Sequence, residues 1–540
     1  MSFSKLSIEL IQRIIRFTIP DSFENAAATC KLLYMASRFL VDEYRKTKRF
    51  QHFRYSRHCS ERDYLCEAAN LPGGVHMSCK NPQHWDEATA VSGIKIANAI
   101  GLLQAIAREP DLAWHIQSLD LKDPDRHLWQ AENQPSFTQA TTQDVQNLHR
   151  LYRAAMPSDS ETGGEDFALW MKHITPFLAD IFILNLVPNV VEIALSKSWG
   201  RVDIVNAANL ELLDAMVGRA NDPTVRDAPL AQLAVVKPYV GHGWDAHGCL
   251  TPLASFLALN SVREFYMGGV QAFSDNDTDI PFSPRHAVYG NSLKKIELNG
   301  SAVGPRALSA LLSRTPQLEC FHLGLESKPG EFGGRYNIGH LLAIICAHVG
   351  GSLKDLALHN NSLEIYTYTL TNMHGFTRLQ ILELDINSLC GPEFSATELL
   401  PSGRFDEYFP RFPADARPAL PRLVDLLPPS LVAFMLGFST VLQRSPTTDN
   451  EYVFFRLPEL LAGFRDERST KLPRLSDIVF DPPFDIERYA EKNRDRKFAN
   501  SIHSILREAE TCGVRWERGT FSCFRTFNDR FDVKNVSEDY

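Results

Sequence analysis

Long apolar runs are missing from this sequence. The most apolar candidate, Phe177 to Leu195, contains Asp180 and Glu192, whereas a helix that crosses a bilayer needs about 20 predominantly apolar residues in succession. The N-terminal segment also has Glu9 where a signal peptide would be apolar. We therefore expect no membrane span and no secretion signal, and we expect the chain in the cytoplasm, the nucleus or both.

Paired cysteines are also missing. The ten cysteines are scattered over 540 residues without a compact framework, which indicates free, mostly buried thiols in a reducing compartment. Cys59, Cys66, Cys79 and His84 are zinc-type ligands, but the six, twelve and four residues between them are unlike the paired C-x-x-C of zinc sites. We predict no zinc there.

Catalytic signatures are missing as well. The sequence contains no G-x-S-x-G, no G-x-x-x-x-G-K-[ST], no H-E-x-x-H and no G-x-G-x-x-G motif. In the stretch 241–248, His242, Asp245 and His247 suit a metal or an acid–base set, although a glycine-rich surface loop explains the same residues. We predict no catalytic residue, no metal and no cofactor; the alternative is a metal-dependent enzyme with a site near His242–His247.

An excess of positive charge is missing too. The net charge of -9 argues against general nucleic-acid binding. A local basic stretch from Arg45 to Arg57 is interleaved with aromatics, and we interpret it as a solvated helix face. Apolar residues make up 44% of the chain and charged residues 22%, which is ordinary for a globular protein.

What the sequence does contain begins with a helical segment, Phe3 to Tyr44. Apolar residues recur at helical spacing from Leu6 to Phe17, and Ser7 is placed to cap that helix. Pro20 breaks the pattern, so we expect a second short helix from residue 21 or 22 and a third from Cys30 to about Lys46. Three short helices bury little surface, and these carry more aliphatic side chains than they can hide, which predicts a partner.

This segment resembles the F-box. That family begins an amphipathic helix with Leu-Pro-x-Glu-Leu/Ile and, after an acidic or serine cap, ends a second helix with Val-Cys-Lys/Arg-x-Trp/Tyr. In this chain Ser7 stands in place of the usual proline, and the matching positions are Leu6, Glu9, Leu10, Ile14, Asp21, Cys30, Lys31 and Tyr34. The resemblance implies that residues 1–48 form an F-box that docks the Skp adaptor and, through it, a cullin. The apolar adaptor contacts or F-box core would be Leu6, Leu10, Ile11, Ile14, Ile15, Leu32 and Leu33.

Further along, the hexad L-x-x-L-x-L recurs, which is the strand signature of a leucine-rich repeat. Two copies also carry the asparagine of that repeat, Leu353 to Leu363 and Leu379 to Leu389. Weaker copies have their middle residues at Leu119, Ile193, Leu213, Leu233, Phe265, Ile296, Phe321, Phe434 and Ile478. Alternate residues of each strand would face the core, and helices would return the chain at residues 304–312 and 336–348.

These features predict an α/β protein: an N-terminal three-helix F-box followed by an irregular leucine-rich-repeat α/β solenoid, with a curved parallel sheet and helices outside. We expect a helical linker over 49–113, the solenoid with inserted loops over 114–516, closed by a strand or a cap at Val514–Trp516, and a tail over 517–540. Target recognition would use the loops and the outward strand residues, among them Lys294, Lys295, Glu297, Glu319, His322, Lys354, Asp355 and Glu383.

The combination resembles the F-box proteins common in filamentous fungi. It implies a substrate-recognition subunit of an SCF-type ubiquitin ligase, in which the solenoid binds a target protein and the chain itself performs no chemistry. The alternative of another class is a repeat scaffold for protein–protein interaction outside any ligase.

Overall fold

The chain divides into two compact units. Unit 1 comprises Met1–Tyr239 with Leu259–Val262, and unit 2 comprises Val240–Ala258 with Arg263–Tyr540. The computed structural model describes residues 6–19, 22–54, 90–91, 94–96, 98–122, 141–155, 174–196, 199, 207–237, 248–272, 290–325, 338–360, 372–385, 389, 420–437, 457–481, 504–505 and 507–516.

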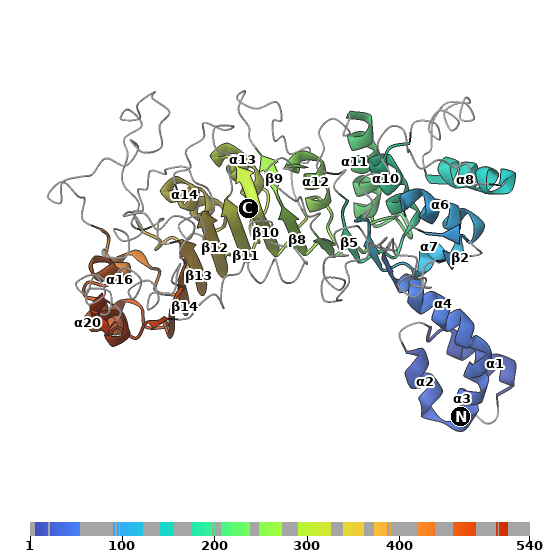
Figure 1. Ribbon diagram of the computed structural model, residues 1–540, viewed down its shortest axis with the longest axis horizontal. Helices are drawn as coiled ribbons and strands as arrows, with labels where there is room; N and C mark the ends of the chain where they lie inside the picture. Colours follow the sequence, from blue (N-terminus) through green and yellow to red (C-terminus); the bar gives the residue numbers. More distant parts are fainter. Residues whose placement is uncertain are drawn as a thin grey trace, which may run out of the picture. The chain divides into compact units, whose positions relative to one another are not determined.

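Unit 1 begins with four helices and one 3₁₀ turn (Figure 1). They are α1 (Ile8–Arg16), α2 (Phe23–Thr29), α3 (Lys31–Ser37), η2 (Arg38–Leu40) and α4 (Val41–Gln51). Ser7 caps α1, because its hydroxyl accepts a hydrogen bond from Leu10 N at 3.4 Å. The prediction of one continuous third helix is wrong. The Ser37 hydroxyl bonds back to the Tyr34 carbonyl at 2.7 Å, and the chain tightens into η2 there before α4 begins.

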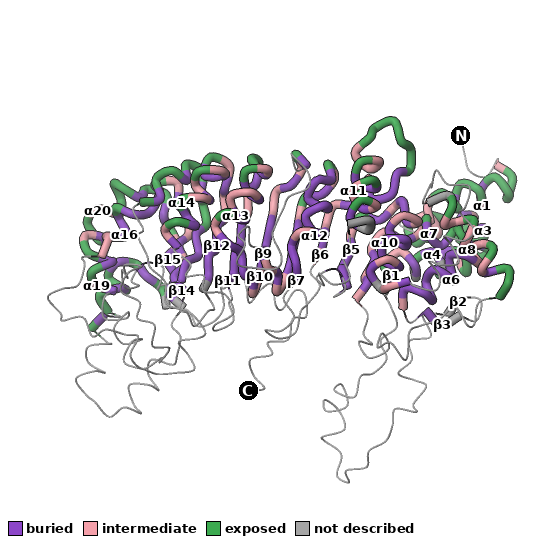
Figure 2. The backbone as a smooth tube through the Cα atoms, turned by 90° about the horizontal axis from the view of Figure 1, so that it is seen from above, coloured by how far each residue is buried: buried purple, intermediate pink, exposed green. Residues whose placement is uncertain are grey.

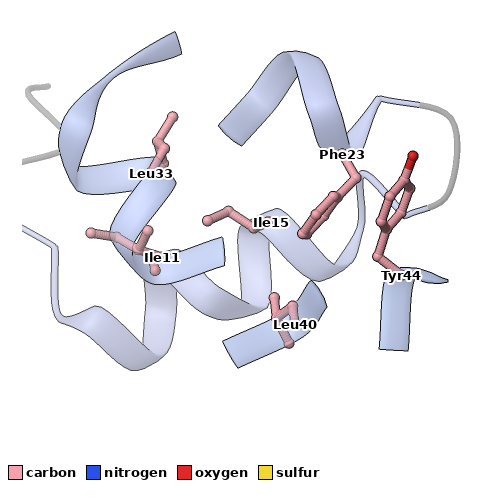
Figure 3. Close-up of a cluster of buried hydrophobic side chains, with 7 residues drawn as sticks. Ile11, Ile15, Phe23, Leu33, Leu40 and Tyr44 are labelled. Atoms are coloured by element: carbon pink, nitrogen blue, oxygen red, sulfur yellow. The ribbon is translucent and has the colours of Figure 1, made fainter. Parts of the chain in front are cut away.

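A compact apolar core holds these helices together (Figure 3). Ile15 of α1 points toward Phe23 of α2, and Ile11 lies near Leu33 of α3. The rest of the buried set is Ala36, Leu40 and Tyr44. Leu6, Ile19, Leu32 and Val41 pack against it while partly buried. The spacing of Ile11 and Ile15 by four residues puts both on one side of α1, so the opposite side of this helix is left outside the core.

The rest of unit 1 is a parallel sheet with helices. Its strands are β1 (His52–Arg54), β4 (Ser118–Asp120), β5 (Glu192–Ala194) and β6 (Val235–Lys237), paired in that order. Its helices are α6 (Ala99–Arg108), α7 (Asp111–His115), α8 (Thr142–Ala155), α10 (Pro176–Leu186) and α11 (Ala207–Asn221); β2 (Ala90–Val91) and β3 (Ile94–Lys95) form a separate antiparallel pair. The sheet therefore begins at β1, inside the segment predicted to be a helical linker. A strand of three residues without a hexad cannot be predicted from its sequence pattern. Residues 52–54 form a strand because they pair with β4.

Unit 2 is built around a longer parallel sheet, in the order β8 (Glu264–Gly268), β10 (Lys295–Val303), β11 (Cys320–Leu325), β12 (Asp355–Asn360), β13 (Ile381–Asp385), β14 (Ala433–Gly437), β15 (Asp477–Asp481) and β16 (Arg515–Trp516). Beside β10 lie β9 (Val270–Ala272) and β7 (Gly248–Cys249). The predicted strand at Val514–Trp516 is confirmed by β16, which pairs with β15.

The register of this sheet follows the hexads. Their middle residues pair strand to strand across the whole unit, and all are at most 1% exposed: Phe265, Ile296, Phe321, Leu356, Leu382, Phe434 and Ile478. The last apolar residue of each hexad points to the same side as the middle one, because side chains alternate along a strand. The first apolar residue comes before the strand begins and is also buried. The asparagines expected after two of the strands, Asn361 and Asn387, lie outside the described residues.

Helices cover that apolar side of unit 2 (Figure 2). They are α12 (Leu250–Leu257), α13 (Pro305–Leu312), α14 (Ile338–Val349), α16 (Leu423–Leu426), α19 (Leu457–Leu460) and α20 (Phe464–Lys471). The predicted helical returns coincide with α13 and α14 and are confirmed. Of the helices described in either unit, none is long and apolar enough to cross a membrane.

Two of the weaker hexads were misplaced. Leu210 and Leu213 lie in α11, not in a strand, because apolar residues three apart suit a helix as well as a hexad. The strand predicted around Leu233 lies three residues later, where Val236 of β6 pairs with Ile193 of β5. The hexads around Leu119 and Ile193 do form strands, namely β4 and β5.

Candidate functional site

Exposed apolar side chains gather on the N-terminal helices. Leu10 is 45% exposed, Ile14 36% and Phe17 82%. They lie four and three residues apart, so they follow one ridge along α1 and its C-terminal end. From α3 and η2, Tyr34 and Met35 are more than half exposed, and Phe39 is 78% exposed.

We call Ile8, Leu10, Ile14, Phe17, Tyr34, Met35 and Phe39 the apolar docking set. They are seven of the twelve strongly exposed large apolar residues in the part of the chain that the structure describes, yet they fall within 32 residues of sequence. Phe17 of this set also lines a shallow depression of about 360 Å³, together with Glu9, Gln12, Arg13, Arg16 and Leu40. A concentration of exposed apolar side chains on one small group of helices is typical of a protein-binding region.

The structure separates the predicted adaptor contacts into two groups. Ile11, Ile15 and Leu33 are buried in the core, and Leu6 and Leu32 pack against it. Among these seven residues, only Leu10 and Ile14 have side chains that are exposed to solvent. Of the motif residues, those exposed to solvent are Glu9, Cys30, Lys31 and Tyr34, whereas Asp21 lies outside the described residues.

Polar contacts hold the frame beneath the docking set. Arg16 of α1 forms an ion pair with Glu43 of α4 at 2.9 Å. Glu24 of α2 accepts hydrogen bonds from Tyr44 at 2.5 Å and from Lys48 at 3.0 Å, both on α4. The hydrogen bond from Tyr44 is the main reason that the pKa of Glu24 lies below its ordinary value, with Lys48 adding to it. These pairs are solvated and contribute little stability each, but they fix the angle between α1, α2 and α4.

A second candidate lies in unit 2, on the side of the sheet opposite the buried hexad residues. Figure 1 shows its strands β10, β11 and β12 next to one another. We call Lys295, Glu297, Cys320, His322 and Asp355 the outer-face cluster; they come from the neighbouring strands β10, β11 and β12. Glu297 Oε1 lies 2.9 Å from His322 Nδ1 and 2.7 Å from Lys295 Nζ. On the other edge of the imidazole, His322 Nε2 lies 3.1 Å from Asp355 Oδ1.

Burial gives this cluster unusual chemistry. Glu297 and His322 are each only 5% exposed. Burial acts to raise the pKa of Glu297, but the hydrogen bond to His322 and the charge of Lys295 outweigh it, so the carboxyl pKa lies below its ordinary value. Burial raises the pKa of the Cys320 thiol above its ordinary value. A buried carboxylate and a buried imidazole beside a half-buried thiol are groups that can hold a metal ion.

Three other predicted outward residues, Lys294, Glu319 and Lys354, each stand one residue before a strand of this sheet. Lys294 and Lys354 both form ion pairs with Glu319, at 3.1 and 2.5 Å. Glu383 is buried and contacts the imidazole of His359. Each of these predicted outward residues is therefore paired with an opposite charge.

Several predicted sites lie outside the described residues. These are the stretch from His242 to His247, Cys59, Cys66, Cys79 with His84, and most of the inserted loops. The alternative of a metal-dependent enzyme near His242–His247 stays a prediction.

Five residues of the candidate sites were not predicted: Ile8, Phe17, Met35, Phe39 and Cys320. Phe17 follows Leu10 by seven residues, so helical spacing alone placed it on the same ridge as Leu10 and Ile14. Phe39 carried no such signal, because the break at η2 decides where it points. Cys320 stands two residues before His322, and in a strand that spacing puts both side chains on one face.

No family model matches this chain, and no curated protein is significantly similar to it.

Proposed function

We propose that the chain is the substrate-recognition subunit of an SCF-type ubiquitin ligase. Its N-terminal helices act as an F-box that docks the Skp adaptor, which in turn binds a cullin. The sheet of unit 2 and its inserted loops act as a leucine-rich-repeat-like solenoid that binds a target protein. Such a complex works in the cytoplasm or the nucleus.

The apolar docking set is the observation that carries this proposal. A chain that folded for itself alone would have no use for Leu10, Ile14, Phe17 and Phe39 in solvent, because each side chain costs free energy when it is left in water. Burying an aliphatic or aromatic side chain in a partner stabilises a complex by about 1.5–3 kcal/mol. Several of them together are enough for a specific complex after the cost of association.

The repeated register of the sheet supports the second half of the proposal. Seven hexad centres pair in one row, which leaves the side chains between them in rows on the opposite face. A face of this kind, with charged groups at fixed spacing, suits the binding of a protein surface of complementary charge. The chain would contribute proximity: it raises the effective concentration of target lysines beside the ubiquitin-charged enzyme.

Co-purification with the Skp adaptor tests the docking half. The double variant Leu10→Asp/Ile14→Asp puts two charges on the exposed ridge of α1 and leaves the core residues Ile11 and Ile15 in place. We expect the wild type to form a stoichiometric complex and the double variant to bind at least roughly 100-fold more weakly, since desolvating two charges in an apolar interface costs several kcal/mol.

The matched control is Val225→Asp. Val225 is an exposed apolar residue, 39% accessible, outside the docking set, so this variant should bind the adaptor like the wild type. Absence of any adaptor complex with the wild-type chain would rule out the docking role and with it the ligase function. An adaptor complex that never recruits a cullin would instead favour the scaffold alternative.

A further inference from the structure

The outer-face cluster contains three potential metal ligands in contact. Cys320 and His322 alternate along β11, and Asp355 of β12 is the register partner of Cys320. Cys320 Sγ lies 3.3 Å from His322 Nε2 and 3.7 Å from Asp355 Oδ2, and His322 Nε2 lies 3.1 Å from Asp355 Oδ1. Ligand atoms of Glu297, Cys320 and His322 also lie within 4.8 Å of one another.

These separations suit a tetrahedral ion. Sulfur, nitrogen and oxygen ligands bound to zinc at about 2.0–2.3 Å, with tetrahedral angles between them, lie roughly 3.3–3.6 Å apart. We propose that Cys320 Sγ, His322 Nε2 and the carboxylate of Asp355 bind one zinc ion on the outer face of the sheet. The ion would sit between β11 and β12, with only small shifts of the three side chains.

Glu297 has a different part, as a positioning residue. Its Oε1 lies 2.9 Å from Nδ1 of His322. With a small reorientation of the ring on zinc binding, Nδ1–H would donate to the carboxylate and Nε2 would keep its lone pair for the metal. Carboxylate–histidine–zinc arrangements of this kind orient the ring and make it a better ligand. Lys295 contacts the same Oε1. With zinc bound, the positive charges of the ion and of Lys295 balance the three negative charges of Glu297, the Cys320 thiolate and Asp355.

Access and proton balance are consistent with such a site. The Asp355 side chain is 31% exposed, so an ion can enter from solvent. Binding displaces the thiol proton of Cys320, which is released to solvent as the Sγ–zinc bond forms. Three protein ligands leave the fourth position of a tetrahedral ion open, and a water or a donor atom of a bound protein completes it. The site does not depend on the adaptor role proposed above.

Cobalt substitution in the purified full-length chain tests the proposal. After treatment with a chelator, we expect one equivalent of Co²⁺ to give tetrahedral visible bands together with a near-ultraviolet thiolate charge-transfer band, and Zn²⁺ to displace it. Cys320→Ser should abolish the charge-transfer band. Asp355→Asn, at a partly exposed position, should weaken binding at least roughly tenfold, and Glu297→Gln about 10- to 100-fold while keeping the thiolate band.

The matched control is Cys346→Ser, which changes a thiol on α14, away from the outer face, and should leave the spectrum as in the wild type. Thermal unfolding of each variant checks that the fold is kept. A thiolate–cobalt band that survives in Cys320→Ser, or a wild-type chain that binds no Co²⁺ or Zn²⁺, would overturn the proposal. X-ray absorption of the zinc form should show one sulfur among nitrogen and oxygen ligands, and a zinc shell without sulfur would also overturn it.

Discussion

The ring of Phe23 stacks on the ring of Tyr44, with centroids 4.4 Å apart and planes inclined by 18°. Phe23 is the first residue of α2 and Tyr44 lies in the first turn of α4, so this pair joins two helices across the core of the N-terminal bundle (Figure 3). The Tyr44 hydroxyl continues the same connection through Glu24. The docking set depends on this frame, because it lies on helices that the frame orients.

We predict that Phe23→Ala destabilises the N-terminal helices by about 3 kcal/mol, from the lost apolar contact and the cavity it leaves. Chemical denaturation followed by an N-terminal fluorescence probe measures the loss. The matched control is Phe39→Ala, the same chemical change at a side chain 78% exposed, which should change stability by less than about 0.5 kcal/mol. Equal effects of the two variants would contradict the packing described for this core.

Acid should weaken unit 1 through Asp144. Arg108 of α6 donates two hydrogen bonds of 2.8 Å to this carboxylate on α8, and mainly for that reason its pKa falls to about 2. A carboxyl whose pKa is lower in the folded than in the unfolded chain stabilises the fold above its unfolded pKa of about 4, and that contribution is lost as the pH falls toward 2. We expect a loss of about 1.4 kcal/mol between pH 7 and pH 3, which is roughly half of the full contribution of this carboxyl.

Urea unfolding at about pH 7 and about pH 3 measures this loss. Asp144→Asn removes the titrating group and keeps a side chain of the same size. The free energy of unfolding of this variant should therefore be lower than that of the wild type at about pH 7 and should change less between about pH 7 and about pH 3. If the variant retains the full acid sensitivity of the wild type, another carboxyl is responsible.

Alkaline pH should weaken unit 2 through His359. Burial alone would lower the pKa of this imidazole, and nearby His322 adds to that, but the charge of Glu383 and its hydrogen bond, with Asp385 behind them, raise it above its ordinary value. The charged pair therefore stabilises the fold fully below the unfolded pKa of about 6.5, and the contribution is lost as the pH rises through the folded pKa.

The measurement is the urea midpoint from about pH 6 to about pH 9. Glu383→Gln removes the charge that holds the proton on His359. At pH 6 we expect this variant to be less stable than the wild type by at least about 1 kcal/mol. Its urea midpoint should also fall less as the pH rises. A midpoint for Glu383→Gln that falls as steeply as that of the wild type would show that the pair does not titrate as described.

Sequence pattern was sufficient for much of the architecture. The hexads around Phe265, Ile296, Phe321, Leu356 and Leu382 placed five neighbouring strands of unit 2. They could do so because each strand buries apolar residues at the same spacing, and that spacing can be read from a short stretch of sequence. Ser7 and the apolar spacing of α1 placed the first helix for the same reason: capping and periodicity are local. The hexad of Leu210 and Leu213 was misplaced because that spacing is shared by helix and strand.

Only the folded chain decided which residues are offered to a partner. Leu10 and Ile11 are adjacent in sequence and alike in chemistry, yet Ile11 is buried in the core of the helices while Leu10 is left in solvent. Cys320 and Asp355 are 35 residues apart and become neighbours because β11 and β12 pair in one register. Local preferences follow from short stretches of sequence, whereas burial and contact depend on residues that are distant along the chain, and these are fixed only when the helices and strands pack.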